Sequence, residues 1–279
     1  MYEQFYSLRE KPFALIPDPA FLFPAKRHRH ALTMLEYALS QASGFALITG
    51  EVGCGKTTVV RHFLESTAEP LNVAFITNAY PGLGPLLPWI MDALGQESGD
   101  SSPSELYRRF VTYVKKVYAA GVRTMLVIDE AQNLSVESLE ELRVLSNVNA
   151  GKDLQLQTVL IGQPELRQTL RQQNMRQFAQ RIVIDHHLEA LQPAETLGYV
   201  RHRLTVAGGK ADLFTPEALN LVHQCTGGVP RLVNIVCDTA LVLGFADQRP
   251  SIDAAIVEQV IQDRSDGGLL PLRAVLVPA

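Results

Sequence analysis

Cysteine is scarce in this sequence, with three copies among 279 residues, at Cys54, Cys225 and Cys237. Three widely separated cysteines cannot build a disulfide framework, and they show no Cys-x-x-Cys or Cys/His spacing of the kind that binds a metal. The sequence therefore argues against a disulfide-stapled secreted domain and against a zinc-finger type of site. A reducing, intracellular compartment fits this cysteine usage best.

An excess of charge of one sign is also lacking. The chain has 25 Lys and Arg against 29 Asp and Glu, which gives a formal net charge of -4. This balance argues against a protein that coats nucleic acid through its overall charge, although a local basic face is compatible with it. Because 47% of the residues are hydrophobic and 19% are charged, the chain can bury a core. We expect one large domain or two unequal ones.

Long hydrophobic runs are absent as well. No apolar run approaches the roughly 20 residues that a membrane-spanning helix needs, and residues 1–18 contain several charges and two prolines, unlike a signal peptide. We therefore expect no signal peptide, no membrane span and a cytoplasmic protein, with peripheral attachment to the inner membrane left open. Residues 266–279 are apolar but short and interrupted by proline, and we expect a loosely packed C-terminal tail there.

Short β-rich apolar runs are present in the first two thirds of the chain. Each of them except the last is followed by a longer stretch with helical spacing. Continuous apolar strands that alternate with helices are typical of a parallel sheet covered on both faces. We therefore expect a doubly wound α/β domain with a five-stranded parallel sheet. The runs are Phe45–Thr49, Val73–Thr77, Thr124–Ile128, Leu156–Ile161 and Arg181–Ile184.

The pattern changes after Pro193, where apolar residues recur at helical spacing with no strand between them. Thr215 and Pro216 have the pattern of an N-cap followed by proline at the first helical position, and Ser251–Asp253 precede the last helix in the same manner. A small all-helical domain is thus expected to follow the α/β domain. The predicted organisation is an N-terminal extended strap over residues 1–30, the α/β domain over 31–192, the helical domain over 193–265 and the tail over 266–279.

Residues 50–57 have the pattern Gly-x-x-x-x-Gly-Lys-Thr, between an apolar run and a helical stretch. In this pattern the glycines let the loop curl so that backbone N–H groups face phosphate oxygens, and the following helix adds its positive end. Lys56 would reach the β- and γ-phosphates of ATP, and Thr57 would offer its hydroxyl to Mg²⁺. A chance glycine turn is the alternative, which the strand–loop–helix context disfavours. The predicted nucleotide-binding residues of this loop are Gly50, Glu51, Val52, Gly53, Cys54, Gly55, Lys56, Thr57 and Thr58.

Two carboxylates end the third apolar run, where Met125–Ile128 is followed by Asp129 and Glu130. The carboxyl edge of a parallel sheet is where a ligand crevice opens. Asp129 would hold the Mg²⁺ shell there, and Glu130 would orient and polarise the attacking water. Two exposed acids at a strand end are the alternative, which the presence of Lys56 disfavours.

Six longer stretches of the sequence, two of which contain the motifs above, resemble the sequences of a known family. They are FYSLREKPFALIPDPAFLF, GEVGCGKTT, VIDEAQNLSVESLEELRVLSN, LIGQPELRQTL, RQFAQRI and GGVPRLVNIVCDTAL. Together they resemble AAA+ ATPases, and more narrowly the ExeA/GspA-type ATPases of general secretion and exopolysaccharide systems, over essentially residues 1–264. The resemblance implies a P-loop AAA+ fold with a helical lid and Mg²⁺-dependent hydrolysis of ATP. It also implies a homo-oligomer, as a ring or a filament, that switches a protein partner in export across the bacterial envelope.

The same resemblance implies roles for single residues. Gln163 lies at the sensor 1 position, where a polar side chain aligns the water and the γ-phosphate, with a helix cap as the alternative. Arg181 resembles the arginine finger that enters the neighbouring subunit's site, and Arg176 is its rival. Arg231 resembles sensor 2, which contacts the γ-phosphate in cis, although this stretch also makes sense as helix punctuation. Asn78 matches a position that can hold the catalytic glutamate away from water until assembly.

Other functions stay open at this point. The runner-up is a DNA-binding regulatory ATPase resembling the transposition ATPases TnsC and MuB, whose nucleotide state would control a filament on duplex DNA. The net acidity counts against it, whereas the arginines between Arg167 and Arg203 leave room for a basic face. A third option is a nucleotide-gated scaffold that scarcely hydrolyses ATP.

Two local features carry further expectations. The basic cluster at residues 26–30 (KRHRH) is interpreted as a solvated helix start rather than as a binding site. Cys54 lies beside Lys56 and before the positive end of the following helix, and both favour the thiolate form. We therefore expect Cys54 to be a reactive thiol that ATP protects from alkylation, with a shielded residue that only fills the loop as the alternative.

Overall fold

The computed structural model describes residues 1–40, 44–77, 79, 84–97, 99, 101–149, 154–265 and 272. The chain divides into two compact units. Unit 1 consists of Met1–Arg29, Val52–His62 and the chain from Glu189 onwards, whereas unit 2 consists of His30–Glu51 and Phe63–Leu188. Asn78 and all of the predicted tail except Leu272 lie outside the described residues.

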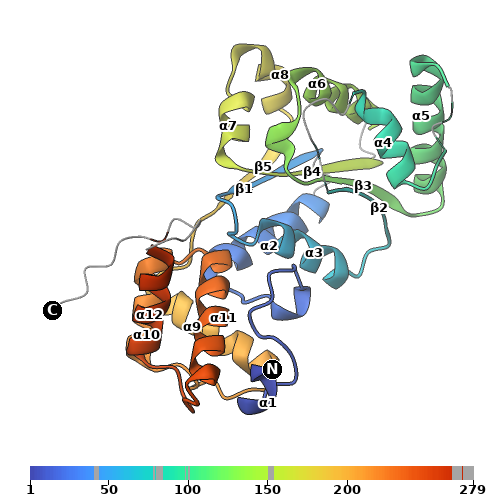
Figure 1. Ribbon diagram of the computed structural model, residues 1–279. Coiled ribbons are helices and arrows are strands. Elements are labelled where there is room, and N and C mark those ends of the chain that lie inside the picture. Colours follow the sequence, from blue (N-terminus) through green and yellow to red (C-terminus); the bar gives the residue numbers. More distant parts are fainter. Residues whose placement is uncertain are drawn as a thin grey trace. The chain divides into compact units, whose positions relative to one another are not determined.

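A five-stranded parallel sheet runs through the described part of unit 2 (Figure 1). Its strands are β1 (Phe45–Gly50), β2 (Leu71–Ile76), β3 (Arg123–Ile128), β4 (Leu156–Gly162) and β5 (Ile182–Leu188), in the order β2-β3-β4-β1-β5. Every residue of β1 and β4 is buried, whereas the edge strands β2 and β5 are partly exposed. Inner strands of a parallel sheet are covered on both faces, which explains their continuous apolar sequences. The predicted five-stranded parallel sheet is confirmed.

The strand register brings three chain segments to the same edge of the sheet. Thr49 of β1 pairs with Gly162 of β4, and Ile128 of β3 pairs with Leu160 of β4. Because all the strands are parallel, the residues that follow β1, β3 and β4 leave the sheet at its carboxyl edge. That edge is where ligands bind in open α/β sheets.

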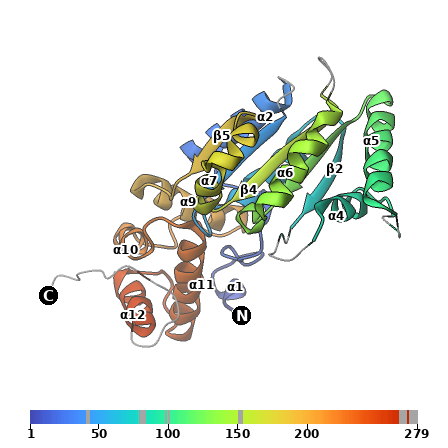
Figure 2. The same cartoon turned by 90° about the horizontal axis from the view of Figure 1, so that it is seen from above.

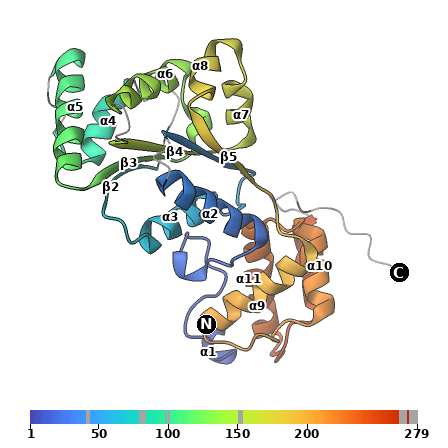
Figure 3. The same ribbon diagram turned by 180° about the vertical axis from the view of Figure 1, so that it is seen from behind.

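One face of this sheet is covered by a continuous group of helices (Figure 1, and Figure 2 from above). Buried side chains of these helices and of strands β1 to β4 form one hydrophobic cluster. Residues 30–40 of helix α2 (Lys26–Ser40) lie on the opposite face (Figure 3). The covering helices are α4 (Leu86–Ala93), α5 (Pro103–Ala119), α6 (Val136–Leu145), α7 (Pro164–Leu170) and α8 (Arg176–Ala179), with the 3-10 turns η2 (Ala131–Asn133), η3 (Ser146–Val148) and η4 (Gln173–Met175) between some of them.

Helices form the core of unit 1, in agreement with the helical periodicity of the sequence. The N-cap at Thr215 follows the prediction, since its hydroxyl accepts the Ala218 N–H at 3.3 Å. Before the last helix it is the Asp253 carboxylate, two residues after Ser251, that accepts the Ile256 N–H at 3.2 Å. The elements are α1 (Tyr2–Phe5), the 3-10 turn η1 (Pro19–Phe21), α9 (Pro193–Val206), α10 (Pro216–Thr226), α11 (Pro230–Ala246) and α12 (Ala254–Ser265). Helix α3 (Lys56–Ser66) begins in unit 1 and ends in unit 2. No helix of the described residues is both long enough and apolar enough to cross a membrane.

The N-terminal segment packs on these helices and contains the short helices α1 and η1, so it is not extended throughout. Phe13 is 1% exposed and contacts Phe214 edge to face, with ring centroids 6.0 Å apart. The guanidinium of Arg203 is buried, donates hydrogen bonds to the Pro12 and Ala14 carbonyls and lies over the ring of Phe21. The segment is therefore an integral part of the core of unit 1.

This packing generates a prediction for stability. Phe13→Ala removes a buried ring, and we expect it to lower the free energy of unfolding by about 3 kcal/mol or more. Ile16→Ala is the matched control in the same segment, because Ile16 is 81% exposed, and its effect should stay within about 0.5 kcal/mol. Urea denaturation followed by circular dichroism measures both. Equal stabilities of the two variants would contradict the packing of Phe13.

Candidate nucleotide-binding site

The predicted phosphate-binding loop, residues 50–57, is called the phosphate loop below. Gly50 and Glu51 belong to unit 2, and the loop lies in unit 1 from Val52 onwards. Gly53 and Gly55 have φ values of +82° and +90°, a region that side chains other than glycine rarely adopt. A Cβ atom on Gly53 would also lie 2.4 Å from the Cβ of Arg231. The backbone therefore requires glycine at position 55 of the motif and also at position 53, which the motif leaves variable. Lys56 begins helix α3 and is buried.

Two successive carbonyl groups of this loop accept hydrogen bonds from other parts of unit 1. The Gly53 carbonyl accepts the backbone N–H of Arg231 at 3.1 Å, near the start of α11, where the N–H groups have no partner within the helix. The Cys54 carbonyl lies 3.0 Å from Nε2 of His28. A carbonyl oxygen only accepts, so Nε2 carries the proton in this contact. The loop is held by α11 and by the first turn of α2.

The side chains of the loop divide into buried and accessible ones. Cys54 is 1% exposed, so an alkylating reagent has no direct access to its thiol in this conformation. The expectation of a reactive Cys54 is therefore wrong for this conformation, because loop packing shields the sulfur despite its favourable electrostatic setting. Glu51 and Val52 are exposed, and Thr57 and Thr58 are half-buried.

Arg231 lies directly beside the phosphate loop. Its Cβ and side-chain carbons approach the Cα of Gly53 closely, and its side chain is exposed. Helix α11 has proline at its first position and begins after Gly227 and Gly228, both with positive φ. This stretch thus ends α10 and begins α11, and it also places Arg231 beside the loop.

The remaining predicted site residues lie in unit 2, and all of them except Arg181, which precedes β5, lie at the carboxyl edge of the sheet. Gly50 ends β1, and a Cβ atom there would lie 2.6 Å from the carbonyl oxygen of Leu188. Asp129 directly follows β3, is 6% exposed, and its N–H donates to the Ile76 carbonyl at 2.8 Å. The Asp129 carboxylate accepts the N–H of Glu130 at 2.9 Å. These contacts fix Asp129 at the edge between β2 and β3.

Glu130 is held by a small hydrogen-bond network. Its backbone is left-handed, with φ +54°, a conformation that is uncommon for residues other than glycine and is often found at functional sites. Oε2 of Glu130 accepts Nε2 of Gln132 at 2.6 Å and Nε2 of Gln163 at 3.5 Å. The Gln132 oxygen accepts the backbone N–H of Gln163 at 3.0 Å. A backbone N–H can only donate, so this contact defines which end of the Gln132 amide faces Glu130.

The network has two implications for the predicted sites. Gln163 is the N-cap residue of α7 by position, but its side chain makes no cap hydrogen bond and approaches Glu130 instead. Gln132 is a contact of Glu130 that we did not single out from the sequence. The sequence feature that could have indicated Gln132 is its position two residues after Glu130, just after the end of a strand.

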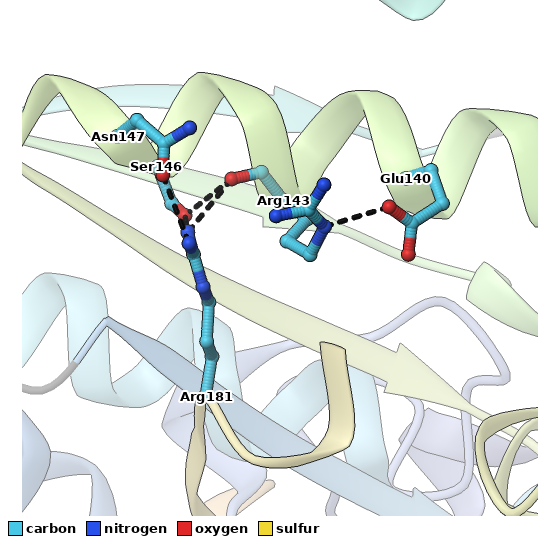
Figure 4. Close-up of polar contacts among 5 residues, drawn as sticks. All are labelled: Glu140, Arg143, Ser146, Asn147 and Arg181. Atoms are coloured by element: carbon cyan, nitrogen blue, oxygen red, sulfur yellow. Dashed lines mark hydrogen bonds and ion pairs between the residues drawn. The ribbon is translucent and has the colours of Figure 1, made fainter. Parts of the chain in front are cut away.

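Arg181 is bound within its own subunit (Figure 4). Its guanidinium donates to the Arg143 carbonyl at 2.8 Å, to the Asn147 side chain at 2.9 Å and to the Ser146 hydroxyl. These groups lie at the C-terminal end of α6 and in η3, where helix carbonyls lack partners and attract cations. Arg181 therefore joins the start of β5 to the end of α6.

The neighbouring arginines differ from one another in their contacts. Arg167 forms an ion pair with Asp185 of β5. Arg171 and Arg176 are exposed, and no side-chain contact of either is found among the described residues. Of the two arginine-finger candidates, Arg181 is engaged in cis, whereas Arg176 faces solvent.

The basic cluster at residues 26–30 is only partly a solvated helix start. His28 is 5% exposed and contacts the phosphate loop, so our interpretation was wrong for this residue. The same cluster contains exposed Lys26, Arg27, Arg29 and His30. The composition of the cluster could not show which residue faces inward, because this depends on the rotation of the helix about its axis.

Comparison with known proteins gives a consistent assignment. Residues 39–170 match a family model described as AAA domain. The chain is 43% identical over 247 residues to general secretion pathway protein A of Aeromonas hydrophila, which covers 88% of this chain and 45% of that protein. It is also 33% identical over 150 residues to the Mu-like prophage FluMu DNA transposition protein B of Haemophilus influenzae, covering 53% of this chain and 47% of that protein. The chain thus spans about half the length of each of these relatives.

Solved structures extend the similarity to the fold. The Aeropyrum pernix ORC2 protein, solved as ADPNP and ADP complexes, has a TM-score of 0.71 at 18% identity, covering 94% of this chain and 73% of that one. The P-loop α/β fold predicted from the motifs is confirmed by this likeness and by the observed sheet. The motifs, the family match over residues 39–170 and the fold together show an AAA domain with a P-loop fold in this chain, and its sequence resembles general secretion pathway protein A.

Proposed function

We propose that the protein binds ATP with Mg²⁺, hydrolyses it, and uses the cycle in a homo-oligomer, a ring or a filament, to switch a protein partner of a bacterial envelope export system. The observation that carries the proposed chemistry is the carboxylate of Glu130, held in place by two glutamine side chains at the carboxyl edge of the sheet. The proposed process rests on the 43% identity to a general secretion pathway protein. The proposed location is the cytoplasmic side of the inner membrane, with peripheral attachment left open.

In the proposed mechanism, the loop from Gly50 to Thr58 binds the phosphates through its N–H groups and Lys56. Hydroxyl and carboxylate oxygens are the donors that Mg²⁺ prefers, so Thr57 and Asp129 fit this ion. Mg²⁺ would neutralise the charge that develops on the phosphate oxygens. Catalysis then depends mainly on positioning and electrostatics.

Glu130 would orient the water that attacks the γ-phosphate. Gln132 and Gln163 both donate to Oε2, so we assign Oε1 of Glu130 to the attacking water. Gln163 is proposed to contribute to sensor 1, and Gln132 to fix the carboxylate. Arg231, which lies beside Gly53, is proposed to contact the γ-phosphate in cis.

The observed contacts decide between the two candidates for the arginine that acts in trans. From the sequence we favoured Arg181, but its guanidinium already has three acceptors in its own subunit. Reaching a neighbouring site would require Arg181 to give up these hydrogen bonds. Arg176 would not have to leave any side-chain partner among the described residues, so the observed contacts favour Arg176.

A second function is supported by one specific observation. The relative from Haemophilus influenzae is a DNA transposition protein, which is consistent with a regulatory ATPase that acts on duplex DNA. Binding through phosphate contacts should weaken steeply as salt rises from about 50 to 200 mM, because each contact releases counterions. ATP-dependent filaments that form only on duplex DNA would favour this function over export.

We first predict the behaviour of two site variants. Lys56→Ala should lose most of its ATP affinity because the charge on the phosphates is no longer neutralised. Glu130→Gln should bind ATP with nearly unchanged affinity but hydrolyse it at least about 100-fold more slowly, since the amide cannot polarise the water. Nucleotide titration and phosphate release with and without Mg²⁺ measure these effects. Unchanged ATP affinity of Lys56→Ala would overturn the site assignment.

We next predict the outcome of mixing inactive variants. Arg176→Ala should lose about 10³-fold in turnover while still binding ATP, because the arginine stabilises charge only in the transition state. An equal mixture of Arg176→Ala and Glu130→Gln should regain part of the activity, because some interfaces combine an intact Glu130 with an intact Arg176 from the neighbour.

Arg181→Ala serves as the comparison in the same mixing assay. If Arg181→Ala complements Glu130→Gln and Arg176→Ala does not, the finger is Arg181, as we first expected from the sequence. If neither mixture regains activity although sedimentation shows that the variants assemble together, neither residue acts in trans.

A further inference from the structure

His28 occupies an unusual place for a histidine in a basic cluster. It is in the first turn of α2, 5% exposed, with Nε2 at 3.0 Å from the Cys54 carbonyl. A Cβ atom on Gly55 would lie only 3.2 Å from the same nitrogen. The imidazole therefore packs against the phosphate loop at Gly55, which has no side chain, and its donor nitrogen faces the Cys54 carbonyl.

The contact determines where the neighbouring N–H group points. In a trans peptide group, the carbonyl and the N–H of the next residue point in opposite directions. Because His28 holds the carbonyl of Cys54, the N–H of Gly55 points away from His28. In the same way, Arg231 holds the carbonyl of Gly53, so the N–H of Cys54 points away from α11. Two successive peptide groups of the loop are thus oriented through their carbonyl ends.

His28 is itself held in place by contacts of the two residues before it. The backbone N–H of Lys26 donates to the Glu195 carboxylate at 2.9 Å, and Arg27 forms an ion pair with Glu189 at 2.7 Å. Glu195 also accepts the N–H of Gln192 at 3.0 Å, so one carboxylate joins the starts of α2 and α9. Burial alone would raise the pKa of Glu195, but these N–H donors and the nearby His28 and Arg29 lower it overall. The carboxylate that anchors α2 is thereby kept in its charged form.

We propose that His28 is a positioning residue of the phosphate loop. It draws the Cys54 carbonyl to the side of α2 and thereby directs the Gly55 N–H toward the nucleotide phosphates. This role rests on the proposed function, because it requires that the loop binds a phosphate chain. It adds a requirement outside the motif itself: the loop needs a donor from α2 on its outer side. The consequence is that phosphate affinity depends on how α2 is anchored to α9.

The test compares two amide substitutions that differ by one methylene. In His28→Gln the amide nitrogen can reach the place of Nε2 and donate to the Cys54 carbonyl, whereas in His28→Asn it reaches only the place of Nδ1. We expect His28→Asn to bind a fluorescent ADP analogue with Mg²⁺ about 3- to 10-fold more weakly than the wild type, the usual effect of one lost hydrogen bond. His28→Gln should regain most of this affinity. His30→Ala, on the exposed side of the same helix, should leave it unchanged.

Thermal unfolding without nucleotide separates positioning from packing. Both amides lose the packing of the ring, so both should lower the melting temperature by similar amounts, while only His28→Gln recovers affinity. Equal affinities of His28→Asn and the wild type, or equal losses in both amides, would overturn the inference. Lys56→Ala in the same titration tests the proposed nucleotide site itself, so that a failure of the proposed function can be distinguished from a failure of the role of His28. If the wild type binds, Lys56→Ala does not, and His28→Asn binds like the wild type, only the role of His28 fails.

Discussion

The phosphate loop depends on how its outward-facing carbonyl groups are satisfied. A loop that turns consecutive N–H groups toward an anion must turn the matching carbonyls away from it, and buried carbonyls need donors. Here the donors are the Arg231 N–H at the start of α11 and the imidazole of His28 at the start of α2. Glycine at position 53 follows from the same requirement, since α11 approaches too closely for any side chain. The helices around the loop therefore help to define its geometry.

A second constraint acts at the sheet edge, where one carboxylate has to be held without being neutralised. Glu130 achieves this with a left-handed backbone and with amide donors on one oxygen. Amide groups donate hydrogen bonds without carrying charge, so they orient the carboxylate without forming an ion pair with it. An arginine or lysine at the position of Gln132 would instead form an ion pair with Glu130, which would weaken the role in polarising water that we propose for this carboxylate.

The sequence predicted those features that follow from local pattern. The strands, the N-cap at Thr215 and the helical second part of the chain were found because period and capping residues are encoded locally. The phosphate loop stood out through its glycine spacing, and two of its glycines, Gly53 and Gly55, have positive φ values. The inward position of His28, the burial of Cys54 and the engagement of Arg181 with α6 were missed. Each of these depends on which distant segment lies opposite, and this is set by tertiary packing rather than by spacing.

Unit 1 is discontinuous in the chain, and this has a consequence for biosynthesis. Its parts are Met1–Arg29, Val52–His62 and the segment from Glu189 onwards, whereas unit 2 ends at Leu188. During synthesis from the N-terminus, all strands of the sheet emerge before helices α9 to α12 exist. The buried N-terminal aromatic residues, Phe13 among them, then lack their packing partners and expose apolar surface. A nascent chain paused after β5 would thus carry a complete sheet together with an unpaired hydrophobic segment, which is the kind of surface that chaperones bind.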